Sequence, residues 1–269
     1  MNVTISACLI VYNEEKVIER CLKSIHNIVD EIIIVHDGEC FDNTISIAKK
    51  YTEKIFIRKH QGMCEAHKKF AYSMTKSDWI LSIDADEYLS HEIQKNIKIL
   101  VKDESIDAYA FIWPYTDGKK QFSLKFPYRL CLARKSKMYQ WNFPHQPMKT
   151  YGKVAYLPYI IEHWPLYDNY SLKTFKTKQK NWIKKHTKYI LEDIANIDGF
   201  NVDSKEEIIR IQNFYRNRPL FKIIPIFIKI LLLQIYGGQY RSGLNGLKVA
   251  FIAASYEANL LLSVYRHMK

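Results

Sequence analysis

The chain lacks the cysteine patterns that mark many zinc proteins and small secreted domains. Its five cysteines are odd in number, widely scattered and contain no Cys-x-x-Cys pair. We therefore expect neither a zinc site nor a disulfide framework, and a reducing cytoplasm is the natural compartment. The N-terminus also lacks a basic region followed by an apolar stretch, so it does not resemble a secretory signal. Internal repeats and low-complexity tracts are not evident.

Long uninterrupted apolar runs are missing as well. A confident membrane span needs about 20 continuous apolar residues, and the best candidate, 220–233, is interrupted by Lys222, Pro225 and Lys229. The two lysines are seven residues apart and share nearly the same helix face, as in an amphipathic helix at a membrane surface. A buried helix of the fold is the competing interpretation of this segment.

Basic charge, in contrast, is abundant. The 269 residues carry a formal net charge of +12, which attracts anionic partners such as a nucleotide, a phosphorylated acceptor, a membrane surface or a nucleic acid. Seven lysines and no acid lie in residues 169–190, interleaved with aromatic side chains. This segment predicts either a solvated helix face or a region that attracts an acceptor or a membrane.

Strand and helix patterns alternate through the first hundred residues. Apolar strand-like runs occupy residues 3–11, 31–35, 54–58 and 79–83. Helical spacing follows the first run, with Asn13 as the expected N-cap. Repeated βα units predict an α/β fold, a mostly parallel, Rossmann-like sheet with helices on both faces. Residues 108–159 read as irregular strands and loops that complete a substrate cleft. We expect a domain of residues 1–165 and a helical C-terminal region of residues 166–269.

Three carboxylates follow the run at 79–83, namely Asp84, Asp86 and Glu87. Because side chains alternate along a strand, Asp84 and Asp86 leave on one side and can share a cation. A solvated turn is the alternative. Polar residues also follow the first two strands, at 12–14 and at Asp37, and ligands bind beyond the carboxyl ends of parallel strands. The three clusters together predict a nucleotide site.

These segments resemble family 2 glycosyltransferases, the inverting nucleotide-sugar enzymes with a GT-A fold. The matching segments are Leu9–Glu15, Val35–Gly38 with Asp42–Thr44, and Asp78–Glu87. A looser likeness extends to the branch of bacterial lipopolysaccharide-core heptose glucosyltransferases. It is carried by Trp141 with Pro144-His145, by Glu162-His163 and by Gly243–Leu247.

The resemblance implies roles for residues of the donor site. It places Tyr12, Asn13, Glu14 and Asp37 around the nucleoside of the sugar donor. Asp84 is implied as a ribose or metal contact, and Asp86 as the main ligand of Mg²⁺ or Mn²⁺, which neutralises a leaving diphosphate. Lys68 or Lys69 falls where such enzymes often carry an Arg-Asn pair and would face the diphosphate. Surface lysines on a helix are the alternative, and Glu87 is expected to be structural.

The catalytic base is the least defined part of the resemblance. The family turn usually carries an acid where this chain has His36, and Gln146 replaces the glutamate of a His-Glu pair. Inversion by single displacement requires a group that takes the proton of the acceptor hydroxyl. His145 and Glu162 are the candidates for this role, and His163 is a candidate third metal ligand.

We therefore predict a metal-dependent inverting glycosyltransferase, cytoplasmic or peripheral at the inner face of the cytoplasmic membrane. Its partners would be a nucleotide-diphosphate sugar and a surface-polysaccharide, lipopolysaccharide-core or lipid-linked acceptor, with no nucleic acid. A polyprenyl-phosphate sugar synthase is an alternative within the fold. A nucleotidyltransferase is an alternative from a different enzyme class. Such an enzyme normally has a glycine-rich loop after the first strand, whereas this chain has Tyr12-Asn13-Glu14-Glu15 there. A non-enzymatic basic module that binds membranes or nucleic acid has only the net charge in its favour.

Overall fold

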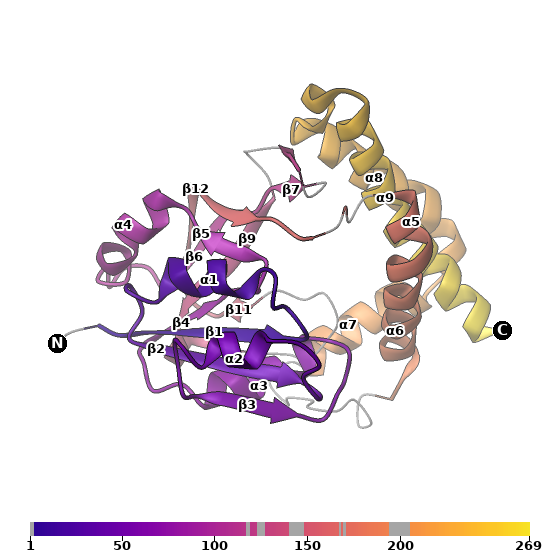
Figure 1. Ribbon diagram of the computed structural model, residues 1–269. Coiled ribbons are helices and arrows are strands. Elements are labelled where there is room, and N and C mark those ends of the chain that lie inside the picture. Colours follow the sequence, from indigo (N-terminus) through magenta and orange to yellow (C-terminus); the bar gives the residue numbers. More distant parts are fainter. Residues whose placement is uncertain are drawn as a thin grey trace. The chain divides into compact units, whose positions relative to one another are not determined.

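The computed structural model describes residues 3–116, 119–122, 127–139, 148–166, 168, 171–193 and 205–269 (Figure 1). The chain forms two compact units. The first comprises residues 1–114 and 127–166, and the second comprises residues 115–126 and 167–269.

The first unit is built on an eight-stranded sheet of order β3-β2-β1-β4-β9-β6-β12-β5. Its strands are β1 (Ile5–Val11), β2 (Glu31–Asp37), β3 (Ile55–Arg58), β4 (Trp79–Ser82), β5 (Glu87–Leu89), β6 (Ala108–Ile112), β9 (Tyr128–Arg134) and β12 (Val154–His163). Strands β3, β2, β1 and β4 are mutually parallel, as the repeated βα pattern predicts. Strand β9 runs antiparallel between β4 and β6, and β5 pairs antiparallel with β12.

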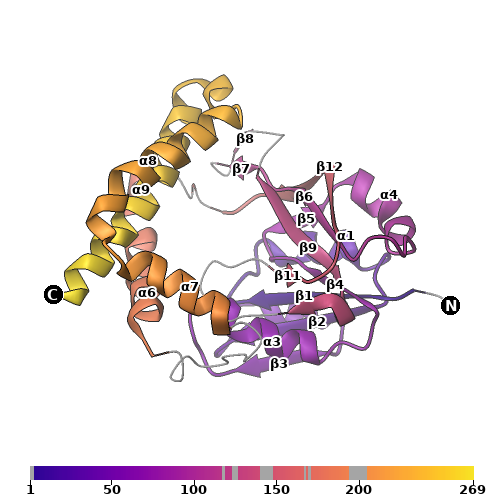
Figure 2. The same cartoon turned by 180° about the vertical axis from the view of Figure 1, so that it is seen from behind.

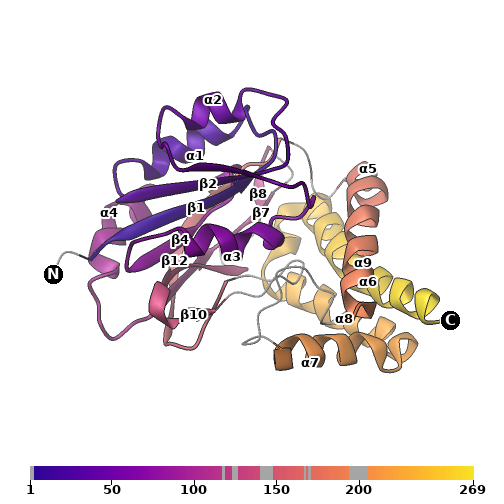
Figure 3. The same ribbon diagram turned by 90° about the horizontal axis from the view of Figure 1, so that it is seen from below.

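Helices cover both faces of this sheet. They are α1 (Ile18–Ile25), α2 (Thr44–Ala48), α3 (Glu65–Ser73) and α4 (His91–Leu100). Figure 3 shows α1 and α2 on one side of β1 and β2, and α3 on the other. Alternate residues of β1 explain this arrangement, because Ile5 and Leu9 pack with α1 and α4 whereas Cys8 packs with α3. The predicted fold class is confirmed.

The second unit is mainly helical, as expected for the C-terminal region. Its helices are α5 (Leu172–Thr174), a π-helical turn (Phe175–Gln179), α6 (Lys180–Leu191), α7 (Lys205–Arg216), α8 (Pro219–Tyr236), a 3-10 turn (Gln239–Ser242) and α9 (Gly243–Met268). Helices α8 and α9 lie side by side, and α9 also contacts α6 and α7 (Figure 2). The short strands β7 (Tyr115–Thr116) and β8 (Gln121–Phe122) pair antiparallel.

The remaining short elements belong to the first unit. A 3-10 turn (Lys135–Lys137) leads from β9 into β10 (Met138–Tyr139), which pairs antiparallel with β11 (Lys149–Thr150). Residues 140–147, and with them the candidate catalytic residue His145, lie outside the described part of the chain.

Candidate active site

Three clusters of predicted site residues lie at one edge of the sheet in the first unit. Residues 12–14 follow β1, Asp37 is the last residue of β2, and Asp84 and Asp86 follow β4. Because β1, β2 and β4 are parallel neighbours, their carboxyl ends meet at the same edge. The three polar clusters that the sequence separates by tens of residues therefore share one side of the fold.

Asn13 connects the ends of β1 and β2. Its backbone N–H donates to His36 Nε2 (3.3 Å), and its side-chain Oδ1 accepts from the Phe41 N–H (2.9 Å). The backbone of Asn13 is left-handed, with φ of 52°, a conformation that asparagine tolerates better than most residues. The expected N-cap role was wrong. Helix α1 begins at Ile18, and its N-cap residue Val17 makes no side-chain capping bond.

His36 uses both ring nitrogens within the protein. Its Nδ1 lies 2.8 Å from the Gly38 carbonyl oxygen, which only accepts, so Nδ1 carries the proton and Nε2 is free to accept from Asn13. The ring is completely buried. At the position where the resemblance leads us to expect an acid, this chain has an imidazole that holds two loops together.

Asp37 holds the loop that joins β3 to α3. Its carboxylate accepts from the N–H groups of Gln61 (2.6 Å) and Gly62 (2.7 Å) and from His67 Nε2 (2.8 Å). Burial acts to raise the pKa of this carboxyl, but the hydrogen bond from His67 and the backbone N–H groups lower it below the ordinary value. Asp37, which the resemblance assigns to the nucleoside, thus already accepts hydrogen bonds from three groups of the protein.

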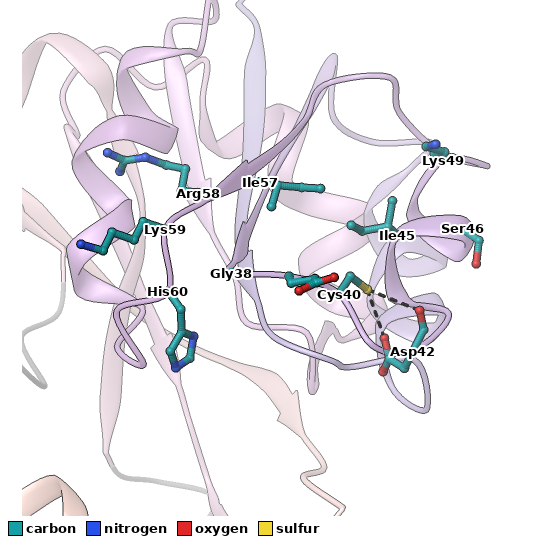
Figure 4. A pocket seen from close by; sticks show the side chains of 11 residues that line it. Gly38, Cys40, Asp42, Ile45, Ser46, Lys49, Ile57, Arg58, Lys59 and His60 are labelled. Carbon is teal, nitrogen blue, oxygen red and sulfur yellow. Dashed lines mark hydrogen bonds between the residues drawn. The ribbon is translucent and has the colours of Figure 1, made fainter.

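A cavity of about 780 Å³ lies beside this loop, between the turn after β2, helix α2 and the end of β3 (Figure 4). Its lining consists of Gly38, Glu39, Cys40, Asp42, Ile45, Ser46, Lys49, Ile57, Arg58, Lys59 and His60. The His60 ring also lies 4.8 Å from the ring of Tyr12, whose side chain is exposed at the end of β1. Gly38 and Asp42 come from the segments that resemble the family, but none of the predicted site residues that the structure describes is among the lining residues.

Glu14 and its neighbour Glu15 tie the loop after β1 to the start of α2. The Glu14 N–H donates to Thr44 Oγ1 (2.6 Å), and the Glu15 carboxylate accepts from the backbone and side chain of Asn43. These bonds keep the two loops in register at the edge of the sheet.

Arg129, on β9, binds the acids that follow β4. Its Nη1 lies 3.1 Å from Asp84 Oδ2 and also contacts Glu87 Oε1. Glu87 is 1% exposed and accepts in addition from Trp113 Nε1 and the Asp84 N–H, so it is a structural residue, as expected. The Asp84 side chain is 42% exposed. The surrounding protein acts to raise the pKa of Asp84, but the opposite effect of the Arg129 guanidinium prevails. The pKa therefore lies below its ordinary value, and Asp84 is ionised at neutral pH.

Arg129 was missed from the sequence. The available signal was an arginine directly before the apolar residues 130–133, since an arginine drawn into a core requires an acidic partner.

Lys68 and Lys69 separate to different faces of α3. Lys68 is buried and Lys69 is exposed. Burial acts to lower the pKa of Lys68, but the carboxylates of Glu65 and Asp84 help to raise it above the ordinary value. Lys68 is therefore the charged lysine that lies in the electrostatic field of Asp84.

Asp86 and His163 come together at the end of the sheet. His163, the last residue of β12, pairs with Glu87 across the strand, and its Nε2 lies 3.5 Å from Asp86 Oδ2. Its Nδ1 is buried without a hydrogen-bond partner, and its ring stacks on Trp113 at 4.3 Å. The Asp86 side chain is 26% exposed. A carboxylate oxygen and an imidazole nitrogen at this separation can bind one cation.

The protein supplies only part of such a metal site. Across the described ranges, no three His, Cys, Asp or Glu side chains group closely enough to hold a metal ion. A carboxylate and an imidazole suit Mg²⁺ or Mn²⁺ when water and oxygen atoms of a bound ligand complete the coordination.

Glu162 is not brought to the Asp86–His163 pair. As neighbours on β12, Glu162 and His163 project to opposite faces of the strand. Glu162 Oε2 accepts a hydrogen bond from Trp164 Nε1 (3.0 Å). Of the two candidates for the catalytic base, the structure describes only Glu162, and strand alternation turns its side chain to the face opposite that of His163.

Comparison with known proteins places the chain in a family. The model of glycosyl transferase family 2 matches residues 6–164. An uncharacterized glycosyltransferase of Rickettsia typhi is 42% identical over 105 residues, covering 39% of this chain and 35% of the relative. The SPbeta prophage-derived glycosyltransferase SunS of Bacillus subtilis is 35% identical over 95 residues, covering 33% of this chain and 21% of the relative. The match thus spans about a third or less of these relatives' lengths.

Two solved structures are similar at low sequence identity. Glucosyl-3-phosphoglycerate synthase of Mycobacterium tuberculosis, in complex with Mn²⁺ and uridine-diphosphate-glucose, is 16% identical with a TM-score of 0.46, covering 67% of this chain and 77% of that one. TarS 1–349 of S. aureus is 15% identical with a TM-score of 0.46, covering 99% and 92%. The family model matches more than half of the sequence, and it ends one residue beyond His163. The chain belongs to glycosyl transferase family 2.

Proposed function

We propose that this enzyme is an inverting, metal-assisted glycosyltransferase that moves a sugar from a nucleotide-diphosphate sugar to a glycan or lipid-linked acceptor. The observation that carries the proposal is the Asp86–His163 pair, with 3.5 Å between Oδ2 and Nε2, beside the edge where β4 ends. In the proposal these two side chains hold Mg²⁺ or Mn²⁺. The bound cation would neutralise the charge that develops on the leaving diphosphate.

The proposal gives the neighbouring residues roles in holding the donor. Asp84, oriented by Arg129, would accept hydrogen bonds from the ribose or contribute to the metal. Lys68 would add positive charge near the diphosphate. Tyr12, Asn13, Glu14 and Asp37 would form the nucleoside end of the site, with the exposed Tyr12 ring available for stacking on the base.

The chemical step would be a single displacement. The acceptor hydroxyl attacks the anomeric carbon, the bond from that carbon to the diphosphate oxygen breaks, and the hydroxyl proton passes to a base. His145 and Glu162 are the proposed candidates for this base. Glu162 also accepts a hydrogen bond from Trp164. Measuring the turnover rate of Glu162→Gln and of His145→Gln at saturating donor identifies which of the two side chains acts as the base.

The acceptor is proposed by class. The likeness to heptose glucosyltransferases favours a lipopolysaccharide core or another surface polysaccharide. The second candidate is a polyprenyl-phosphate sugar synthase, which the exposed apolar side chains of α8 favour. Residues 1–165 would bind the donor and catalyse transfer. Residues 166–269 would associate with the acceptor or with the inner face of the cytoplasmic membrane.

Calorimetric titration of the full chain with nucleoside diphosphates, with and without Mn²⁺, tests the proposal. We expect Mn²⁺ to increase the affinity for at least one nucleotide, and Asp86→Asn to reduce that Mn²⁺-dependent affinity by tenfold or more. Asp103→Asn is the matched control, since Asp103 is an exposed carboxylate after α4. A screen of sugar nucleotides for release of the sugar then identifies the donor.

Two results would contradict the proposal. One is unchanged Mn²⁺-dependent turnover in Asp86→Asn. The other is binding that depends steeply on salt but not on the metal, which is expected of a non-enzymatic basic module.

A further inference from the structure

Helix α8 exposes its apolar residues instead of burying them. Phe221 is 82% exposed, Ile224 69%, Ile228 48% and Leu232 59%. Their spacing of three or four residues places them on one face of the helix. A helix of a soluble domain normally turns such a face toward the core. The exposed face of α8 therefore needs a partner outside the described part of this unit.

Helix α9 extends the same apolar surface. Leu244 is 86% exposed and Phe251 57%, and their separation of seven residues puts them on one face of α9. The Phe251 ring lies 5.5 Å from the ring of Phe227 on α8, so the exposed rows of the two helices adjoin. We call this surface the α8–α9 apolar face and define it as Phe221, Ile224, Ile228, Leu232, Leu244 and Phe251.

The sequence of these helices is predominantly basic, although Lys248 pairs with Asp168 (3.1 Å) and Arg210 with Glu207 (3.8 Å). Residues 208–256 contain no aspartate or glutamate and carry seven basic residues: Arg210, Arg216, Arg218, Lys222, Lys229, Arg241 and Lys248. Lys222 and Lys229 each follow a member of this face by one residue, Phe221 and Ile228, so both lie about 100° round the helix on the same side of the face. The Lys222 ammonium donates to the Phe214 carbonyl oxygen. Aliphatic and aromatic side chains flanked by lysine and arginine match the acyl and phosphate layers of an anionic lipid bilayer.

The other contacts of these helices favour a position on the membrane rather than across it. Both α8 and α9 are long and apolar enough to cross a membrane by length and composition. However, Leu260, Leu261 and Val264 of α9 are buried within the helical unit, and Ser263 bonds Thr187 on α6 (2.8 Å). A spanning α9 would lose these contacts, and a spanning α8 would carry Lys229 into the bilayer core, at a cost that a surface helix avoids.

We propose that the α8–α9 apolar face docks on the surface of an anionic lipid bilayer, with its apolar side chains at the acyl boundary and the flanking basic residues at the phosphate groups. The choice of the cytoplasmic membrane as that bilayer rests on the proposed transfer to an envelope acceptor. Lipid binding itself is independent of that proposal.

Sedimentation of the full chain with vesicles tests the docking. We expect binding to vesicles that contain phosphatidylglycerol, weak binding to phosphatidylcholine alone, and weaker binding to the anionic vesicles as salt increases. The variant F221Q/I228Q should lower the affinity for anionic vesicles by tenfold or more. The matched control I57Q/I99Q changes two exposed isoleucines of the first unit, 61% and 67% exposed, and should bind as the unmodified chain does.

A second variant separates charge from apolar insertion. K229Q/R241Q should weaken binding to anionic vesicles and reduce its salt dependence, without changing the weak binding to phosphatidylcholine. Unchanged circular dichroism and thermal midpoint show that each variant is folded. Mn²⁺-dependent nucleotide affinity, measured without vesicles, should be the same in F221Q/I228Q as in the unmodified chain.

The proposal is overturned if the unmodified chain does not bind phosphatidylglycerol vesicles or if F221Q/I228Q binds them equally well. It is also overturned if the chain self-associates through this face in solution, so that F221Q/I228Q abolishes a dimer while vesicles do not compete with it. Loss of donor turnover with intact vesicle binding would instead contradict the proposed glycosyl transfer alone.

Discussion

The Nε2 atom of His67 lies 2.8 Å from Oδ1 of Asp37 and joins helix α3 to the end of β2. The same carboxylate accepts from the backbone of Gln61 and Gly62. One acid thus holds both the loop after β3 and the helix that carries Lys68. We therefore expect the hydrogen bonds of Asp37 to contribute to the free energy of unfolding of the first unit.

Asp37→Asn should lower the free energy of unfolding at pH 7 by about 1–3 kcal/mol, because the new amide group faces N–H donors that lose their acceptor. The pKa of Asp37 is lowered in the folded protein, so its carboxylate contributes full stability above the unfolded pKa of about 3.9. That contribution is lost as the pH falls through the lower folded value. Urea unfolding at several pH values should show the difference between the two proteins shrinking below about pH 4.

Glu104→Gln is the control for this experiment, because Glu104 is an exposed acid in the turn after α4. We expect it to change the stability at pH 7 by no more than about 0.5 kcal/mol. Equal stability of Asp37→Asn and the unmodified chain at pH 7 would disprove the role of the carboxylate in holding the loop.

Arg129→Met should destabilise the protein by about 3–5 kcal/mol, because it leaves the buried Glu87 carboxylate without its cation. Lys98→Met is a suitable comparison, since Lys98 on α4 pairs with Asp30 at 2.9 Å and both side chains are about two-fifths exposed. Its loss should cost about 1 kcal/mol or less. Chemical denaturation of both variants measures the difference, and similar values for the two would show that the Arg129 cluster adds no special stability.

Asn13→Ala should be less stable than Asn13→Gly by about 1–2 kcal/mol, because φ at this position is 52° and a Cβ without a polar group disfavours the left-handed region. Both variants lose the bond from the Phe41 N–H, so the difference between them isolates the backbone. Thermal unfolding of the pair gives this difference. Equal stability, or a more stable alanine variant, would mean that the turn after β1 relaxes to a negative φ.

His163→Gln should raise the Mn²⁺ concentration required for half-maximal nucleotide binding by about tenfold or more, if the imidazole contributes to the proposed metal site. At saturating Mn²⁺ most of the nucleotide affinity should return, because Asp86 and the diphosphate still hold the cation. His91→Gln, at the start of α4, controls for loss of a histidine at an exposed position. An unchanged Mn²⁺ titration would remove His163 from the proposed ligands.

The sheet and its polar edge could be predicted because their signals are local. Each buried strand is an apolar run, and each polar cluster follows directly after a run, so the parallel βα pattern brings the clusters together. Helical phase also decides which of Lys68 and Lys69 turns inward, but that phase depends on where α3 begins. The N-cap expectation for Asn13 was wrong because this residue bonds to His36 and Phe41, which come much later in the chain.

Arg129 shows why the rest of the site could not be predicted. Its partners Asp84 and Glu87 lie more than 40 residues earlier, and they meet it only because β9 inserts antiparallel between β4 and β6. The strand pattern of residues 108–159 reveals neither that insertion nor its register. The pairing of Asp86 with His163 likewise depends on β5 joining β12.

The central position of β9 also has a consequence for the order in which the protein folds. During synthesis the acids after β4 emerge 42 residues before Arg129, counted from Glu87. Until β9 inserts, Glu87 has no guanidinium beside it and cannot be buried at low cost. The N-terminal βα units can form from contacts that are local in sequence. The edge that carries the acids forms only after β9 pairs with β4 and β6, and such long-range pairing is slower than local contact formation. The edge of the sheet that carries these acids should therefore be among the last parts of the first unit to acquire protection from hydrogen exchange.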